Sequence, residues 1–343
     1  MKKSSLLLVY TGGTIGMKHN PADNTLHPFD FSQIIEEVPE LGKFALKIDS
    51  VTFDPLIDSS DVEPSVWARL AGVIHDNYDD YDGFVVLHGT DTMAYSASAL
   101  SFMLGNLGKP VIFTGSQLPI GVPRTDGREN LISAVEIAAA KNPDGSACVP
   151  EVAIFFDSFL LRGNRATKVS SENFRAFSSP NFPPLAEAGV NIRYNREFIL
   201  PPGRGPLEVH DRLDTRVSIL KIHPGITPEL AETFILSPAI RAVILETYGS
   251  GNAMVRPWLK DILSHARSAG KLIVSVTQCL TGSVDMDLYA TGKFLSDEGV
   301  LSGFDSTTEA MLAKLFYLLG SGLPREELIS ALSRSLRGEI TTY

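Results

Sequence analysis

The sequence Leu6-Leu7-Leu8-Val9-Tyr10-Thr11-Gly12-Gly13-Thr14-Ile15-Gly16 contains five successive apolar residues that end at a pair of glycines. An apolar run of this length is typical of a strand buried on both faces, as in a parallel sheet covered by helices. Paired glycines allow a tight turn and let a ligand approach the backbone closely. Because ligands of open parallel sheets bind beyond the carboxyl ends of the strands, the residues after Tyr10 are the first candidates for a site.

Further apolar runs of strand length alternate with segments of helical period along the chain. This alternation predicts an α/β class. The strand candidates are residues 6–10, 83–87, 110–113, 152–156, 217–222, 242–245 and 272–276. The helix candidates are residues 65–76, 93–104, 129–140, 257–269 and 308–319.

The chain has 343 residues, which is more than one hydrophobic core usually organises. Prolines and glycines are dense between about residue 177 and residue 214, and they end helices and central strands. We therefore expect a larger N-terminal parallel-sheet domain at 1–190, a linker at 191–214, and a smaller C-terminal α/β domain at 215–343.

Composition excludes several classes of protein. Thirty Lys and Arg against forty Asp and Glu give a formal net charge of −10, so a nucleic-acid binder held by phosphate contacts is not expected. Hydrophobic residues make up 44% of the chain and charged residues 20%, which argues against disorder. No apolar run approaches the roughly 18 residues of a membrane-spanning helix, so no membrane partner is expected.

Cysteine and histidine patterns give no sign of a metal site or a disulfide framework. Cys148 and Cys279 lie far apart, and the seven histidines form no HExxH pattern. The apolar run at residues 6–10 is shorter than the roughly 7–15 residues of an export signal. We therefore expect a cytoplasmic protein.

Polar residues directly follow two more apolar stretches. His88-Gly89-Thr90-Asp91-Thr92 follows residues 83–87, and Asp58-Ser59-Ser60-Asp61 follows residues 51–57. Thr and Asp are preferred helix N-caps, so both stretches have an ordinary structural explanation. One cap is sufficient for a helix, however, and a hydroxyl beside a carboxylate after a buried strand also suits substrate binding.

Two other charged features are open to both structural and functional explanations. Arg162, Arg165 and Lys168 recur at a spacing of three, which usually indicates a solvated face. A lysine near a hydroxyl can also act as a base when burial and neighbours lower its pKa. Ser306-Thr307-Thr308-Glu309 fits the S-x-x-E capping box of a helix N-terminus.

Together these motifs strongly resemble the bacterial-type L-asparaginases, and most closely their type I, cytoplasmic branch. The likeness covers nearly the whole chain. The motifs that carry it are Tyr10-Thr11-Gly12-Gly13-Thr14-Ile15-Gly16, Asp58-Ser59-Ser60-Asp61, His88-Gly89-Thr90-Asp91-Thr92, Thr114-Gly115-Ser116-Gln117, Arg162-Gly163-Asn164-Arg165, Tyr248-Gly249-Ser250-Gly251-Asn252, Thr277-Gln278-Cys279, Tyr289-Ala290-Thr291-Gly292 and Leu336-Arg337-Gly338-Glu339.

The resemblance implies an amidohydrolase of asparagine catabolism, which converts L-asparagine to L-aspartate and ammonia without a metal or organic cofactor. It implies that Thr14 is the nucleophile that attacks the side-chain amide. It also implies that Thr90, Asp91 and Lys168 form the second catalytic group of the same site. A threonine hydroxyl is a poor nucleophile until a base takes its proton, so the grouping is chemically reasonable.

The resemblance also implies how substrate is bound and how the enzyme assembles. Asp58, Ser59 and Ser60, together with the catalytic Thr90 and Asp91, are expected to hold the α-amino and α-carboxylate groups. Asn252 and Glu309 are expected to reach the site from a neighbouring subunit. The expected partners are therefore L-asparagine and a second copy of the chain, as an intimate homodimer that commonly pairs again into a tetramer.

This sequence departs from the family pattern at two places. Many members carry a tyrosine on the loop after the first motif, whereas residues 17–29 contain none and Leu26 falls at that position. Some type I enzymes also carry an allosteric asparagine site, whose residues are matched here by Thr167, Thr277, Gln278 and Cys279. Glu246 stands where an arginine is expected, which replaces a cation with an anion and disfavours binding of the same effector in the same geometry.

Two alternative functions remain open at this point. One is a glutamine-preferring or transamidation-linked amidohydrolase of the same architecture; a transamidation subunit usually has an extra domain before the first motif, whereas ten residues precede Thr11. The other is a non-catalytic amino-acid sensor. A sensor would be expected to lack the reactive groups, yet Thr14, Thr90, Asp91 and Lys168 are all present.

Overall fold

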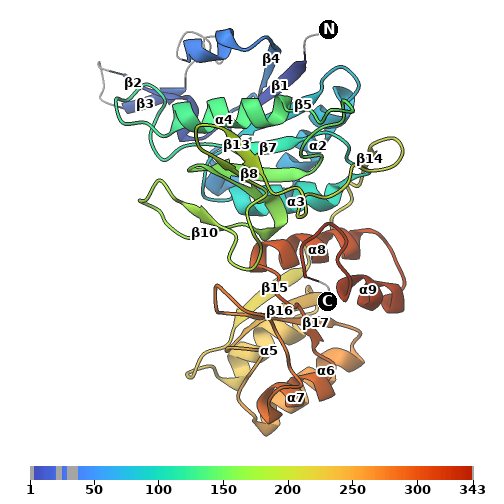
Figure 1. The fold of residues 1–343 in the computed structure, drawn as a ribbon. Helices are drawn as coiled ribbons and strands as arrows, with labels where there is room; N and C mark the ends of the chain where they lie inside the picture. The colour runs from blue at the N-terminus through green and yellow to red at the C-terminus, as the bar shows by residue number, and fades with distance from the viewer. Residues whose placement is uncertain (1–3, 21–24, 29–37, 342–343) are drawn as a thin grey trace. The chain divides into compact units, whose positions relative to one another are not determined.

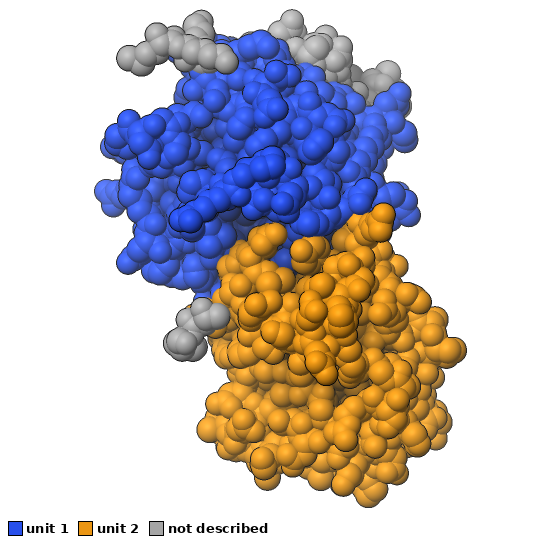
Figure 2. All heavy atoms as spheres, turned by 90° about the vertical axis from the view of Figure 1, so that its right-hand side faces the viewer, with its two compact units in different colours: residues 1–211 blue, residues 212–343 orange. Residues whose placement is uncertain are grey.

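A computed structural model describes residues 4–20, 25–28 and 38–341. Contacts divide the chain into two compact units, residues 1–211 and 212–343, which are coloured separately in Figure 2. Within the described ranges, no helix has both the length and the apolar character needed to cross a membrane.

An eight-stranded sheet forms the centre of unit 1, in the order β13-β12-β9-β8-β7-β5-β1-β4 (Figure 1). The strands from β4 to β8 pair in parallel, whereas β9, β12 and β13 join through antiparallel pairings. The predicted α/β fold with a parallel N-terminal sheet is thus confirmed. Four of its five parallel strands were predicted, whereas β4 and the three antiparallel strands were not. The strands are β1 Ser5–Tyr10, β4 Lys47–Thr52, β5 Gly83–Leu87, β7 Val111–Thr114, β8 Val152–Phe156, β9 Phe159–Arg162, β12 Ala186–Ala188 and β13 Ile192–Tyr194.

A tight hairpin between β8 and β9 causes the change of strand direction. Its two turn residues, Asp157 and Ser158, have φ angles of 45° and 69°. Positive φ at both positions matches the type I′ turn, which joins antiparallel strands directly. The sequence lacks the Asn-Gly or Asp-Gly pair that usually indicates such a turn, so the reversal was not expected.

The segment 191–214, expected as a linker, contains paired strands. Residues 192–194 form β13 at one edge of the sheet, and β14 (Glu208–Val209) pairs with β6 (Leu104–Gly105). Short paired strands therefore lie near both ends of the segment, and the limits of the linker stay a prediction. Proline and glycine end long elements, but they leave backbone groups in between free to pair with an exposed edge.

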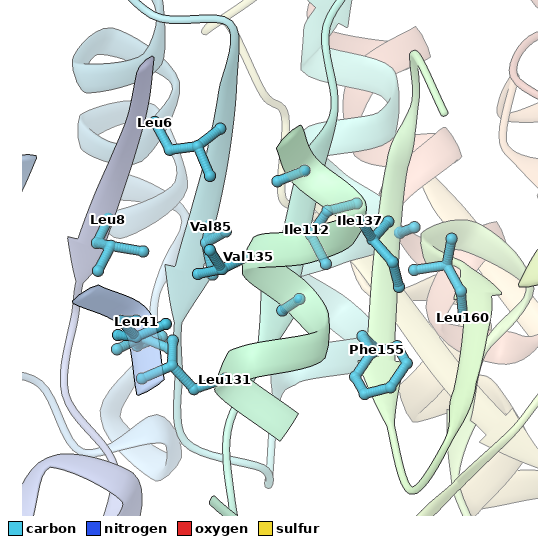
Figure 3. Close-up of a cluster of buried hydrophobic side chains, with 14 of the residues drawn as sticks. Leu6, Leu8, Leu41, Val85, Ile112, Leu131, Val135, Ile137, Phe155 and Leu160 are labelled. Atoms are coloured by element: carbon cyan, nitrogen blue, oxygen red, sulfur yellow. The ribbon is translucent and has the colours of Figure 1, made fainter. Parts of the chain in front are cut away.

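Helices cover the unit 1 sheet and bury both faces of its central strands. Leu131 and Val135 of α4 pack in one hydrophobic cluster with Leu6 and Leu8 (Figure 3). Because side chains alternate along a strand, Leu7 and Val9 face the opposite side of the sheet from Leu6 and Leu8. They are buried as well, so β1 is covered on both faces. The helices are α2 Pro64–Asp76, α3 Met93–Met103 and α4 Gly127–Ala139.

Short elements complete unit 1. They are η1 Thr14–Gly16, β2 Met17–Asn20, β3 Thr25–Pro28, η3 Pro39–Lys43, η4 Ser59–Asp61, η5 Gly163–Arg165, β10 Thr167–Lys168 and β11 Phe177–Ser178. Strand β2 pairs with β3, and β10 pairs with β11.

Unit 2 is a three-layer α/β/α arrangement around four parallel strands in the order β15-β16-β17-β18 (Figure 1). Val243 and Leu245 of β16 pack in a cluster with α5 and α6, whereas Ala242 and Ile244 pack with α8 and α9. The strands are β15 Val217–Lys221, β16 Ala242–Thr247, β17 Leu272–Thr277 and β18 Leu301–Ser302. The helices are α5 Pro228–Leu236, α6 Pro257–Ser268, α7 Ala290–Asp297, α8 Thr308–Gly320 and α9 Arg325–Leu332.

A buried ion pair attaches the C-terminal segment to α8. Lys314 Nζ lies 2.7 Å from Glu339 Oε1, and both side chains are fully buried. The Glu339 carboxylate also accepts hydrogen bonds from the backbone N–H groups of Leu336 and Arg337. Removing one member of a buried pair typically costs about 3–5 kcal/mol. The motif that ends at Glu339 therefore has a structural role.

Candidate active site

The chain order places a topological switch point at β1. After β1 the chain forms β4 on one side of it, and then forms β5 on the other side. In open α/β sheets the crevice beyond the carboxyl ends of the strands at such a point is where ligands bind. The loops after β1, β4 and β5 carry Thr14, residues 58–60, and Thr90 with Asp91, so the three predicted groups meet at this edge.

The three loops approach one another so closely that side chains are excluded at the contacts. A Cβ atom on Gly13 would lie 2.5 Å from both Cα and N of Gly89. A Cβ on Gly12 would collide with the backbone of Ile57, and one on Gly89 would collide with the side chain of Ser59. Gly12 and Gly13 also have φ angles of 139° and 94°, which L side chains rarely adopt. These glycines therefore bring into contact the loops after β1, β4 and β5, which we call the first, second and third loops.

Lys168 joins the two catalytic candidates of the third loop. Its Nζ donates hydrogen bonds to Thr90 Oγ1 at 2.8 Å and to Asp91 Oδ1 at 2.7 Å. The Lys168 side chain is 19% exposed, whereas Asp91 is 61% exposed. The arrangement is a hydroxyl and a carboxylate held by one half-buried amine, which can pass protons between the threonine and its surroundings.

The three cations at a spacing of three do not form a solvated face. Arg162 pairs with buried Glu151, with Nε to Oε2 at 2.6 Å. Arg165 is 2% exposed, and its guanidinium lies 5.0 Å from the ring centroid of Phe182. The surface explanation is wrong because Arg162 and Arg165 are buried with partners inside the unit, and Lys168 pairs with Asp91.

The second loop is held in shape by its own aspartate. Asp58 Oδ1 accepts hydrogen bonds from the backbone N and the Oγ of Ser60, both at 2.8 Å. These hydrogen bonds, the backbone one first, lower the pKa of the Asp58 carboxyl below its ordinary value. Ser59 is 5% exposed, and its Oγ accepts a hydrogen bond from the Asp91 backbone N at 3.3 Å. The second and third loops are therefore linked by side-chain bonds as well as by close backbone approach.

The structural explanation of Thr90, Asp91 and Thr92 as helix caps is not supported. Thr92 is the N-cap residue of α3, but its side chain makes no capping hydrogen bond. Its Oγ1 instead donates to the carbonyl of Ser59 at 2.6 Å. The polar side chains of this loop thus serve contacts within the site.

Tyr10 supports the turn that carries Thr14. The tyrosine is fully buried, and its hydroxyl donates to the carbonyl of Gly13 at 3.5 Å. A Cβ on Gly16 would collide with the Tyr10 ring, so the 3-10 turn from Thr14 to Gly16 packs directly against it. Burial raises the pKa of Tyr10 to about 12, so the residue braces the turn as a neutral phenol.

A buried histidine that sequence reasoning did not select lies directly before the third loop. Trp67 Nε1 lies 2.9 Å from Ser96 Oγ, which lies 3.0 Å from His88 Nε2. His88 Nδ1 lies 2.7 Å from the carbonyl of Gly89, so Nδ1 must be the donor and Nε2 the acceptor. Burial lowers the pKa of His88 to about 4. The one available signal was a histidine next to a glycine at the end of a buried strand.

Asn252 and Glu309, the other predicted site residues, both lie in unit 2. Asn252 follows a tight loop in which Gly249 and Gly251 have positive φ angles, and its Oδ1 accepts a hydrogen bond from Thr291 Oγ1 at 2.7 Å. Glu309 is in the first turn of α8.

The predicted capping box at residues 306–309 is wrong. Thr307 is the N-cap of α8, and its Oγ1 accepts a hydrogen bond from the Ala310 backbone N at 3.1 Å. Glu309 is consequently the second helical residue, not the third, and Ser306 precedes the cap. Adjacent threonines compete for the cap position, and sequence spacing alone does not decide between them.

Four residues matched to an allosteric site gather at the carboxyl edge of the unit 2 sheet. The side chain of Gln278 donates to the backbone carbonyls of Ile222 and Glu246 at 2.6 Å and 2.7 Å. Thr277 Oγ1 accepts from the Cys279 backbone N at 3.0 Å. Glu246 Oε1 accepts from Thr308 Oγ1 at 2.9 Å. The fifth, Thr167, is in β10 of unit 1.

The sequence also predicts that Leu26 stands where many family members have a tyrosine. The side chain of Leu26 lies outside the part of the molecule that the structure describes.

Comparison with known proteins assigns the family. The model "Asparaginase, N-terminal" matches residues 5–200, and "Glutaminase/Asparaginase C-terminal domain" matches residues 216–332. L-asparaginase 1 of Escherichia coli (strain K12) is 44% identical, with 99% of each chain covered. The crystal structure of L-asparaginase I from Vibrio cholerae has a TM-score of 0.90 at 42% identity and covers 99% of this chain and 100% of its own. A 60 kDa lysophospholipase of Mus musculus is 42% identical over 98% of this chain and 62% of its own length.

Two α/β units with a hydroxyl–carboxylate–amine group at a switch point define an enzyme of the asparaginase fold. The chain belongs to the L-asparaginase family. Its likeness to the enzymes named L-asparaginase 1 and L-asparaginase I confirms the predicted type I branch.

Replacement of Lys168 by methionine tests the catalytic group. Lys168→Met keeps much of the apolar stem but removes the amine that holds Thr90 and Asp91. We expect kcat for amide hydrolysis to fall roughly 10²–10⁴-fold, as for loss of a general base. Ammonia release measures it, and Lys141→Met is the matched control because Lys141 pairs with Asp82 elsewhere in unit 1. A loss of less than about threefold would contradict a catalytic role.

Acid stability tests the state of His88. Its pKa in the folded chain, about 4, is below the ordinary value of 6.5, so between these values the unfolded chain binds a proton that the folded chain does not. Stability therefore falls as the pH falls through this window. Between pH 7 and pH 5 we expect wild type to lose about 2 kcal/mol more unfolding free energy than His88→Asn. Urea titration at both pH values measures the difference, and equal losses would exclude His88 as the source.

Proposed function

We propose that this enzyme hydrolyses the side-chain amide of L-asparagine to L-aspartate and ammonia, with Thr14 as the nucleophile. The observation that carries the proposal is the pair of hydrogen bonds from Lys168 to Thr90 and Asp91 beside the Thr14 turn. Family membership supports the reaction class, and the names of the relatives support asparagine as the substrate.

In the first half of the proposed reaction, the Thr14 hydroxyl attacks the amide carbon while a proton leaves its oxygen. The group formed by Thr90, Lys168 and Asp91 receives that proton. The carbonyl oxygen becomes an oxyanion, which backbone N–H groups of the glycine turns stabilise. A proton is returned to the nitrogen as ammonia leaves, and an acyl-threonine remains. Water then attacks the acyl group, releases aspartate and restores the Thr14 hydroxyl.

Charge complementarity supports the proposed binding roles. The substrate ammonium requires anions, which Asp91 and Glu309 supply. The substrate carboxylate requires donors, which the hydroxyl and backbone groups of Ser59 and Ser60 supply. Asp58 keeps the second loop in shape through its bonds to Ser60, so it acts on binding through that loop.

The active unit proposed is an intimate homodimer; in the family such dimers commonly pair again into tetramers. Each site combines Thr14, Thr90 and Lys168 of one chain with Asn252 and Glu309 of the other. The proposed location is the cytoplasm, as for the type I branch. We retain the domain limits at 190 and 215 as part of the proposal, with residues 191–214 between them.

The proposed allosteric residues are expected to respond differently from the family site. Glu246 presents a carboxylate that is bonded to Thr308 and lies 4.0 Å from Lys221 Nζ. An asparagine carboxylate beside Glu246 would be repelled rather than paired. We therefore propose that Thr167, Thr277, Gln278 and Cys279 do not bind asparagine in the geometry of the family's effector site, and a hyperbolic dependence of rate on asparagine concentration would agree with this.

The Thr14→Ala variant tests the proposed nucleophile. We expect it to fold and to lose nearly all amidase activity, because the attacking hydroxyl is gone. Thr14→Ser keeps a hydroxyl and should keep part of the activity. Ammonia release from L-asparagine and from L-glutamine measures both variants and the substrate preference. Normal turnover by a well-folded Thr14→Ala protein would overturn the assignment.

Mixing two inactive variants tests assembly. Thr14→Ala and Glu309→Ala chains are unfolded and refolded together. In a mixed dimer of two-fold symmetry, one site collects both substitutions and the other collects neither. Random pairing makes about half of the dimers mixed, so the mixture should recover about a quarter of wild-type activity. If both parents are dimeric and inactive and the mixture stays inactive, Glu309 serves its own chain.

A further inference from the structure

The side-chain amide of Asn252 is held by a residue from another part of unit 2. Thr291 Oγ1 donates a hydrogen bond to Asn252 Oδ1 at 2.7 Å, although the two residues are 39 positions apart. Because this bond uses the amide oxygen, the oxygen of the Asn252 carboxamide faces Thr291 and its NH₂ group points away from Thr291. The orientation of Asn252 therefore depends on a hydroxyl in the first turn of α7.

Dense packing fixes the distance between the Asn252 loop and α7. A Cβ on Gly251 would lie 2.9 Å from the side chain of Val284 and 3.0 Å from that of Met286. A Cβ on Gly292 would lie 2.7 Å from the carbonyl oxygen of Met286. The Asn252 loop and α7 thus both pack against residues 284–286, and neither contact leaves room for a side chain. This close packing explains why glycine occupies positions 251 and 292 of the two motifs.

The backbone of Asn252 is separately fixed. Its N donates to the carbonyl of Tyr248 at 2.8 Å, and its carbonyl accepts from the Tyr248 N at 2.9 Å. The Ser250 carbonyl also accepts from the Asp285 N at 2.9 Å. These bonds set where the side chain starts but not how its terminal amide is turned, since an amide flip leaves the backbone unchanged.

We infer that Thr291 is a positioning residue for the amidase reaction. Its hydroxyl fixes the amide of Asn252 so that the NH₂ group is presented to an oxygen acceptor of the substrate in the site that Asn252 completes. The inference rests on the role proposed above for Asn252. It also gives a function to the motif at residues 289–292, which the catalytic scheme does not use. Such preorganisation lowers the cost of ordering a side chain at the moment of binding.

Kinetics of matched variants test the inference. Thr291→Val nearly preserves the shape of the side chain but removes the hydroxyl, and we expect kcat/KM for asparagine to fall about 3–10-fold, the range for one lost hydrogen bond. Thr291→Ser restores a hydroxyl and should return to within about twofold of wild type. Asn252→Ala should change kcat and KM in the same proportions as Thr291→Val, because both act through one amide. Thr291→Ala repeats the test if the valine variant does not fold.

A double-mutant cycle separates positioning from a structural effect on α7. In an Asn252→Ala background, Thr291→Val should have no further effect beyond about twofold. Thr233→Val is the control, since Thr233 is an exposed helical threonine that donates to the carbonyl of Glu229. Equal losses from Thr291→Val in both backgrounds would overturn the inference and leave the role of Asn252 intact. An Asn252→Ala variant with normal kinetics would overturn both the inference and the proposed role of Asn252. The Thr14→Ala variant would still test the amidase chemistry separately.

Discussion

The candidate active site depends on direct backbone contact between loops at one edge of a sheet. Where Gly13 meets Gly89 and Gly12 meets Ile57, a single Cβ atom would force the loops apart. Thr14 and Thr90 each follow one of these glycines by one residue. Their relative position is therefore set by direct contact between backbones. The strand order around β1 brings the loops to this edge, and burial of β1 on both faces fixes the strand itself.

Burial then determines what each polar group of unit 1 does. Arg162 pairs with Glu151 inside the unit, where an unpaired charge would be costly. Lys168 lies six residues further on and meets a threonine and an aspartate near the surface. His88 is buried, and its ring nitrogens bond to the uncharged Ser96 hydroxyl and Gly89 carbonyl, so it stays neutral as a link between them. Similar residue types thus have structural or chemical roles according to the depth at which the backbone places them.

Sequence reasoning predicts an element correctly where a local pattern of residues defines it. It fails where tertiary packing decides between alternative local structures. The strands at 83–87 and 152–156 are found at the predicted residues because apolar runs ended by polar loops mark their bounds. The three-residue strands β12 and β13 have no such run, and only pairing with an available edge makes them strands. Thr14, Thr90, Asp91 and Lys168 were indicated by residue type and resemblance. Trp67 and Ser96 were not indicated, because hydrogen bonds in the folded chain connect them to His88 and no sequence motif marks that connection.

Unit 2 contributes to the proposed site by a different means. Asn252 ends a loop shaped by two glycines, and Glu309 occupies the first turn of a helix that Thr307 already caps. Because Thr307 is the N-cap and bonds to the Ala310 N–H group, Ala310 occupies the position of the capping-box acid and Glu309 precedes it. A negative charge is nevertheless favoured at this end of a helix by the aligned peptide dipoles. The helix end thus stabilises the charge of Glu309, which agrees with the ammonium-binding role proposed for it.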